Sequence, residues 1–146
     1  MYADDAAVTL LSEDECWSLL SSMSVGRLVT IMGGKPEIFP VNFVTQRRTL
    51  LFRTAQGTKL YSAVMGEGVA FEADYHDAPL TYGWSVIIKG RAHVLSANAD
   101  ILDAEEAPLR QWIATLKPIY VRVIASEITG RRFKFGLEPH HETIID

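Results

Sequence analysis

Hydrophobic and polar positions alternate along most of this chain with the period of two that is typical of half-buried β-strands. Residues 26–32 and 36–45 are rich in apolar and β-branched side chains, and the Gly33-Gly34 pair between them predicts a hairpin turn. Residues 46–48 predict a turn that leads back into a strand over residues 49–53. The first third of the chain therefore predicts an antiparallel meander.

Three more segments follow the same alternation. They cover residues 69–75, 84–95 and 119–125. Gly90 interrupts the longest of them and predicts a bulge or a bend. Because six antiparallel strands cannot all be edge strands, the most economical arrangement is a closed or nearly closed antiparallel barrel.

Short helices are predicted where the strands are joined. Ser12 and Glu15 have the spacing of a capping box, which predicts a helix over residues 13–23. Residues 58–65 predict a second helix. Residues 100–116 also contain helix-forming side chains, but a proline divides them. The pattern as a whole predicts a mainly β protein of the α+β kind.

Composition and charge narrow the range of functions. A chain of 146 residues with 48% hydrophobic content predicts one domain over residues 1–146, with residues 1–11 and 137–146 as flexible ends. The net charge is -4, and the lysines and arginines are spread along the chain rather than clustered. A nucleic acid is therefore not an expected partner.

Membrane attachment and secretion are not expected either. No apolar run approaches the ~20 residues of a membrane-spanning helix, and the first residues are acidic where a secretory signal would be basic. Cys16 is the only cysteine, which excludes an internal disulfide and fits a reducing compartment. We therefore expect a cytoplasmic protein.

One turn has the chemistry of a phosphate site. An apolar strand ends at Thr54, and a helix begins a few residues later, after Gly57. Unpaired amides at a helix start attract anions, and Thr58 and Lys59 would add a hydroxyl and an ammonium group. This set suits a phosphate monoester, although the same residues also fit an ordinary solvated helix cap. The glycine patterns of nucleoside triphosphate and Rossmann dinucleotide sites are absent.

From about Ser12 to Phe135 the chain resembles the pyridoxamine 5'-phosphate oxidase-like flavin-binding split barrels, in particular their small actinobacterial-type members. Four features carry this resemblance in the expected order. They are an opening helix followed by Val25-Gly26-Arg27-Leu28, the strand Pro40-Val41-Asn42-Phe43-Val44, the turn from Phe52-Arg53-Thr54 to Gly57-Thr58-Lys59, and Gly83-Trp84-Ser85-Val86 followed by Lys89-Gly90-Arg91-Ala92.

The resemblance implies a six-stranded antiparallel split β-barrel that forms a homodimer, with flavin mononucleotide (FMN) bound in two clefts between the subunits. The ring edge is then expected against the backbone of Pro40, Val41 and Asn42. Trp84 and Ser85 would reach the flavin from the partner subunit. The residues implied around the phosphate are Arg53, Thr54, Gly57, Thr58 and Lys59.

The activity implied is that of an FMN-dependent oxidoreductase acting on a small organic molecule, with the redox step carried out by the flavin. No catalytic side chain is identified. The basic segment that true pyridoxamine phosphate oxidases carry on the second strand is replaced here by Ile38-Phe39-Pro40-Val41-Asn42-Phe43, which argues against that substrate. Two alternatives stay open: a deazaflavin-dependent reductase of the same fold, and a non-enzymatic flavin or haem storage or sensing module.

Several other residues have simpler interpretations. Cys16 is expected in the core, and the four histidines lack metal-ligand spacing, so no metal site is expected. Arg131 and Arg132 fit either a solvated pair or the mouth of a cleft that admits an anion. Trp84 and Val86 are expected on an exposed apolar face that a second subunit covers.

Overall fold

The computed structural model describes residues 6–66 and 68–137. They form one eight-stranded antiparallel sheet and three short helices. In chain order, the elements are β1 (Val8–Leu10), α1 (Glu13–Leu20), β2 (Val25–Met32), β3 (Lys35–Asn42), β4 (Val44–Gln46), β5 (Thr49–Thr54), α2 (Lys59–Val64), β6 (Gly68–His76), β7 (Tyr82–Val94), α3 (Asn98–Glu105) and β8 (Ile119–Lys134).

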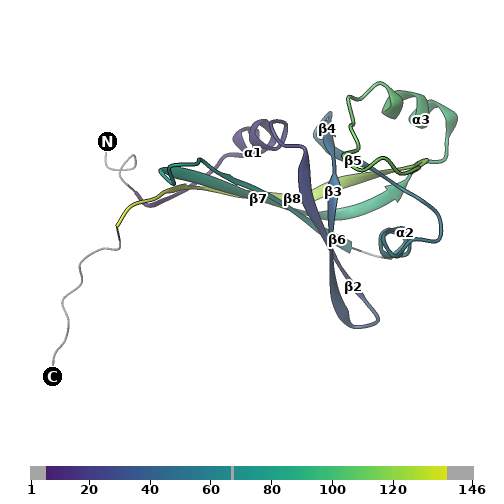
Figure 1. Ribbon diagram of the computed structural model, residues 1–146, viewed down its shortest axis with the longest axis horizontal. Helices are drawn as coiled ribbons and strands as arrows, with labels where there is room; N and C mark the ends of the chain where they lie inside the picture. The colour runs from purple at the N-terminus through teal and green to yellow at the C-terminus, as the bar shows by residue number, and fades with distance from the viewer. Residues whose placement is uncertain (1–5, 67, 138–146) are drawn as a thin grey trace.

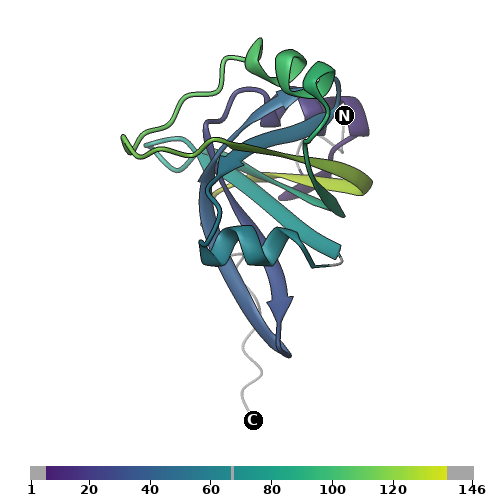
Figure 2. The same ribbon diagram turned by 90° about the vertical axis from the view of Figure 1, so that its right-hand side faces the viewer.

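The sheet curls on itself without closing completely. The strands follow the order β3-β2-β6-β7-β8-β5-β4, and β1 pairs with the far end of β8. β3 and β4 therefore end the order, while β3 also contacts β5 across the remaining gap. Figures 1 and 2 show β7 and β8 as the long spine of the sheet, with β1 paired to one end of this spine and α2 and α3 near the other. The fold is the expected split barrel.

The alternation in the sequence becomes the two faces of this sheet. Leu28, Phe71 and Ile88 point into the barrel from neighbouring strands and are almost completely buried. Polar and charged positions between them face outward. The hairpin turn at Gly33 and Gly34 has positive φ angles at both residues, which glycine adopts without strain.

The predicted turn at residues 46–48 is confirmed, although it uses two arginines where glycine or asparagine is usual. Arg47 and Arg48 both have positive φ angles, of 48° and 57°. Ion pairs hold each of them: Arg47 binds Asp103 near the end of α3, and Arg48 binds Asp14 in the first turn of α1. This turn therefore ties both helices to the end of the sheet.

The sheet has two more strands than the six expected. Val8, Thr9 and Leu10 pair with Phe133, Arg132 and Arg131, so the prediction that residues 1–11 are flexible is wrong for the part that forms β1. Asn42 ends β3, and β4 begins only after Phe43, whose buried ring leaves the ladder for the core. At the other end, Leu137 is exposed, and residues 138–146 lie outside the described part of the chain.

The helices are shorter than predicted. α1 has the expected capping box of Ser12 and Glu15 but ends at Leu20 rather than at residue 23. The Ser21 and Ser22 hydroxyls bond to carbonyl groups of the last turn, which competes with continuation of the helix. The helical part of residues 100–116 ends at Glu105, before Pro108. The bulge expected at Gly90 is confirmed by a register shift between Lys89 and Gly90.

Candidate functional site

The predicted phosphate turn lies between β5 and α2 and is open to ligand. Gly57 has a φ of +84°, and no atom lies within 4 Å of the place where a Cβ would stand. In the described part of the chain, the amides of Gln56 and Gly57 have no hydrogen-bond acceptor. An anionic oxygen can therefore approach the backbone here, so the turn fits a phosphate group.

The two threonines of this turn stabilise its shape. Thr58 is the N-cap of α2: its hydroxyl accepts from the amide of Tyr61 at 3.1 Å and donates to the carbonyl of Ala55 at 2.7 Å. The Thr54 hydroxyl is buried and lies 3.1 Å from that of Thr58. Either hydroxyl would have to exchange an existing hydrogen bond in order to bind a ligand.

Lys59 places its charge at the edge of the turn, next to β3. Its Nζ lies 2.9 Å from Oε1 of Glu37 on β3. The lysine side chain is 62% exposed, and an ion pair this accessible contributes only about 0–1 kcal/mol. A phosphate group could therefore replace Glu37 as the partner of Lys59 at little cost.

The Arg53 side chain is held more firmly than that of Lys59. Its Nε donates to the carbonyl of Lys117 at 2.7 Å, and the guanidinium carbon lies 5.5 Å from the centre of the Tyr120 ring. These contacts fix the plane of the guanidinium group. The two terminal nitrogens have no protein acceptor in the described chain and stay available for an anion.

Pro40, Val41 and Asn42 lie on β3, which contacts β5, the strand that leads into the turn. The Lys59–Glu37 ion pair also joins the turn to β3. Val41 points into the core, and Pro40 is exposed at the sheet edge. Because β3 ends the strand order, main-chain groups along its outer edge have no neighbouring strand.

The Asn42 side chain is already engaged. Its Oδ1 accepts from the amide of Trp112 at 2.9 Å, and its Nδ2 donates to the carbonyl of Ser24 at 3.3 Å. The backbone of Asn42 pairs with Val25 in the sheet, and its side chain keeps one Nδ2 hydrogen for a further partner. The structure also brings the connection between α3 and β8 to the candidate site, where Trp112 contacts Asn42 and Lys117 contacts Arg53. The sequence motifs did not indicate this segment. An aromatic residue shortly after a helix-ending proline was the only sequence signal for it.

Trp84 and Ser85 lie apart from the turn within one chain. They are near the start of β7, toward the chain termini, whereas the turn precedes α2 at the opposite end of the sheet (Figure 1). Trp84 is 3% exposed and Val86 is fully buried, so the expectation that they form an exposed apolar face is wrong. The outward positions are those of Ser85 and Ile87, the latter 41% exposed.

Ser85 pairs with Arg131 across the β7–β8 ladder, and both line a hollow of about 260 Å³ on the outer face of the sheet. Arg132 points to the other face, where it lies 3.8 Å from Glu15. The two arginines therefore do not act as a pair. A second hollow of about 470 Å³ adjoins Ser85 and is lined by Asp74, His76 and Phe133, among others.

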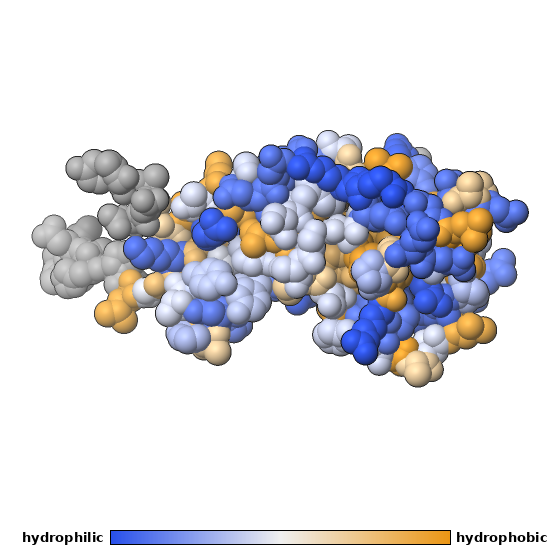
Figure 3. All heavy atoms as spheres, turned by 90° about the horizontal axis from the view of Figure 1, so that it is seen from above, coloured by the Kyte–Doolittle hydropathy of each residue, from blue (hydrophilic) through white to orange (hydrophobic). Residues whose placement is uncertain are grey.

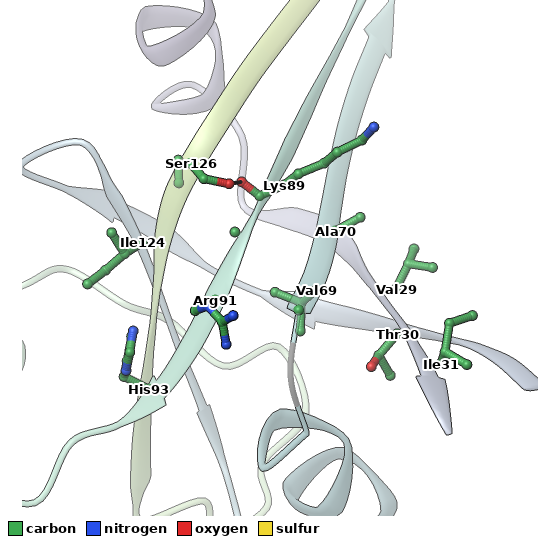
Figure 4. Close-up of a pocket in the computed structure, with 13 residues that line it drawn as sticks. Val29, Thr30, Ile31, Val69, Ala70, Lys89, Arg91, His93, Ile124 and Ser126 are labelled. Atoms are coloured by element: carbon green, nitrogen blue, oxygen red, sulfur yellow. Dashed lines mark hydrogen bonds between the residues drawn. The ribbon is translucent and has the colours of Figure 1, made fainter. Parts of the chain in front are cut away.

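A groove of about 580 Å³ on another part of the molecule contains none of the predicted site residues. It runs over the outer face of β2, β6, β7 and β8 (Figure 4). Lys89, Arg91 and His93 line it together with apolar side chains such as Ile31 and Ile124. The Ser126 hydroxyl donates to the carbonyl of Lys89 at 3.0 Å and closes one side of the bulge there.

Among the titratable groups with shifted pKa values, Glu72 is half-buried and Cys16 is buried. Burial, followed by the neighbouring Asp74 carboxylate, raises the pKa of Glu72 to about 7, although Arg27 lies 2.6 Å away and opposes the shift. Burial also raises the pKa of the Cys16 thiol, which packs against Gly130 as the predicted core residue. A thiol with a raised pKa is a poor nucleophile.

Residues 6–66 and 68–137 contain neither a membrane-spanning helix nor a cluster of metal-binding side chains. No helix there is long and apolar enough to cross a membrane. Within the same residues, no three histidine, cysteine, aspartate or glutamate side chains gather closely enough to hold a metal ion. His140 and His141 lie outside the described chain.

Comparison with known proteins identifies the family. The sequence model described as Pyridoxamine 5'-phosphate oxidase matches residues 12–132, and the chain belongs to this family, as the sequence motifs predicted. A protein of Mycobacterium tuberculosis described as uncharacterized is 57% identical over 96 residues, which cover 66% of this chain and 86% of that protein.

Solved structures agree with this assignment. The FAD binding protein from Mycobacterium smegmatis is 49% identical to this chain, with a TM-score of 0.77 over 87% of this chain and 99% of the other. A conserved protein of unknown function from Corynebacterium diphtheriae is 36% identical, with a TM-score of 0.74 over 88% and 99% of the two chains.

Proposed function

We propose that this protein binds a flavin nucleotide where β3 meets the turn between β5 and α2. The phosphate group would bind at Arg53, Gly57 and Lys59, and the ring would lie along the outer edge of β3. One observation carries the proposal: the turn that the family resemblance links to the phosphate is joined by the Lys59–Glu37 ion pair to β3, the strand that carries the segment implied for the ring. The relative named as an FAD binding protein supports the choice of a flavin.

The sequence motifs favour FMN, whereas the Mycobacterium smegmatis relative is named for FAD. Both nucleotides carry a phosphate at the same position of the ribityl chain, so the same turn serves either. No side chain crowds the backbone at Gly57, so the first phosphate of either nucleotide could approach it. We therefore propose a site whose affinity depends on the first phosphate group.

The proposed activity is the oxidation or reduction of a small organic molecule, for which a bound flavin supplies the redox chemistry. The chain's own contribution is to bind the nucleotide and to fix its orientation. Arg53 and Lys59 would neutralise the phosphate charge, and the edge of β3 would meet the polar edge of the ring. We also propose that a second copy of the chain completes the site with the outward face around Ser85 and Arg131.

Equilibrium titration of the purified protein with FAD, FMN and riboflavin tests this proposal. Riboflavin is the matched control because it contains the ring and lacks the phosphate. We expect both nucleotides to bind at least about tenfold more tightly than riboflavin, since charge-assisted contacts to phosphate contribute roughly 1.5–3 kcal/mol. Equal affinity for all three would rule out the phosphate turn, and binding of none would rule out a flavin protein.

A further inference from the structure

The connection from α3 to β8 crosses the gap of the split barrel at the proposed site. We call residues 107–118 the strap. One hydrogen bond ties it to β3, from the Trp112 amide to Oδ1 of Asn42 at 2.9 Å. Another ties it to β5, from Nε of Arg53 to the carbonyl of Lys117 at 2.7 Å. The strap is therefore anchored on both sides of the gap, each time at a residue of the proposed site.

Although its backbone is fixed, the strap leaves large apolar side chains uncovered. Trp112 is 68% exposed, Ile113 67% and Leu116 83%. Figure 3 shows hydrophobic groups among the hydrophilic surface at the α3 end of the molecule, away from the termini. Three apolar side chains this exposed on one short anchored segment indicate a surface that something covers.

The hydrogen bonds that anchor the strap also indicate what covers its exposed apolar side chains. The Asn42 amide group bonds both Trp112 and Ser24, so it positions the strap against the end of β3. This contact keeps Trp112 next to the strand that we propose for the ring edge. The isoalloxazine ring is flat and aromatic, and an indole ring packs well against such a surface.

We propose that Trp112 forms a wall of the flavin site and packs against the isoalloxazine ring when the nucleotide binds. This inference rests on the proposed function, since it requires the ring to lie along β3. Asn42 is then a positioning residue, and Ile113 extends the wall.

The test compares Trp112→Ala and Trp112→Phe with the wild-type protein, using FAD and FMN as ligands. An indole ring in contact with a flavin quenches its fluorescence, so the brightness of the bound flavin reports the contact independently of activity. We expect Trp112→Ala to weaken flavin binding about tenfold and to brighten the bound flavin. Trp112→Phe should keep most of the affinity and still brighten it. Trp17→Phe, which alters a core tryptophan, is the matched control and should leave both unchanged.

A second variant tests the anchor. Asn42→Ala should weaken binding in the wild-type background and have little further effect beside Trp112→Ala, because releasing the strap matters through the indole ring that Trp112→Ala has already removed. Additive losses would contradict the positioning role.

The inference is overturned if the wild-type protein binds flavin but Trp112→Ala has the same affinity and brightness. It is also overturned if Trp112→Ala changes only the oligomeric state, because the strap would then be covered by a second copy of the chain. Failure of the wild-type protein to bind any flavin would instead reject the proposed function itself.

Discussion

Replacing Lys59 with alanine isolates the only lysine of the proposed phosphate turn. A charge-assisted hydrogen bond to phosphate contributes about 1.5–3 kcal/mol. Binding exchanges this bond for the exposed Glu37 pair, which contributes about 0–1 kcal/mol. The net loss in Lys59→Ala is then about 0.5–3 kcal/mol, which corresponds to a rise in the flavin Kd of roughly two- to 150-fold.

Glu37 and Lys35 provide the controls. In Lys59→Ala, Glu37 stays behind as an uncompensated negative charge beside the phosphate, so Lys59→Ala/Glu37→Gln should recover part of the affinity. Lys35→Ala removes an exposed positive charge that lies two residues before Glu37 on β3 but outside the phosphate turn, and it should leave the Kd nearly unchanged. Fluorescence titration measures all four proteins, with circular dichroism to confirm folding. A folded Lys59→Ala protein that binds FMN and FAD within twofold of the wild type would refute the reasoning.

Three further predictions concern stability and assembly. Gly26→Ala should lower the free energy of unfolding by about 1–3 kcal/mol, because the new Cβ would stand 2.1 Å from the Phe71 ring. In urea unfolding, adding Phe71→Leu to this variant should restore part of the lost stability. A Gly26→Ala protein as stable as the wild type would contradict the packing. Glu72→Gln should stabilise the protein at pH 8 but not at pH 5. Because the pKa of Glu72 is raised in the folded state, the folded protein holds this proton more tightly than the unfolded chain does. The free energy of unfolding of the wild type therefore falls as the pH rises from 4.5 to about 7. If the urea midpoints of Glu72→Gln depend on pH as those of the wild type do, Glu72 is not the cause. Ile87→Asp should weaken the proposed dimer without unfolding the chain, because Ile87 faces outward beside Ser85. Sedimentation should show monomers that retain less flavin than the wild type. If the variant stays dimeric, this face is not part of the interface.

Strands with strict alternation could be predicted from the sequence, because burial of one face is a local property of the pattern. The second half of β8 could not be predicted in this way. Its residues 126–134 are mostly polar, and only their pairing with β7 makes them a strand. β1 was missed for the same reason, since Val8 finds its partner Phe133 more than a hundred residues later.

The residues of the candidate site also divide into those that the sequence pattern indicates and those that only the fold brings together. Gly57 and Lys59 could be identified because a strand, a turn and a helix follow each other directly in sequence. The proximity of Asn42 to Trp112, and of Arg53 to Lys117, depends on how the curled sheet brings β3 near β5. The burial of Trp84 was likewise missed, because alternation alone does not tell which face of a strand points inward.

A crystal structure of the protein with bound FAD or FMN tests the central claim most directly. We predict flavin density with the first phosphate at the turn of Gly57 and Lys59, the ring along the edge of β3, and the Trp112 side chain against it. Flavin density elsewhere, such as in the outer groove lined by Lys89 and Arg91, with the turn empty of phosphate, would contradict the account.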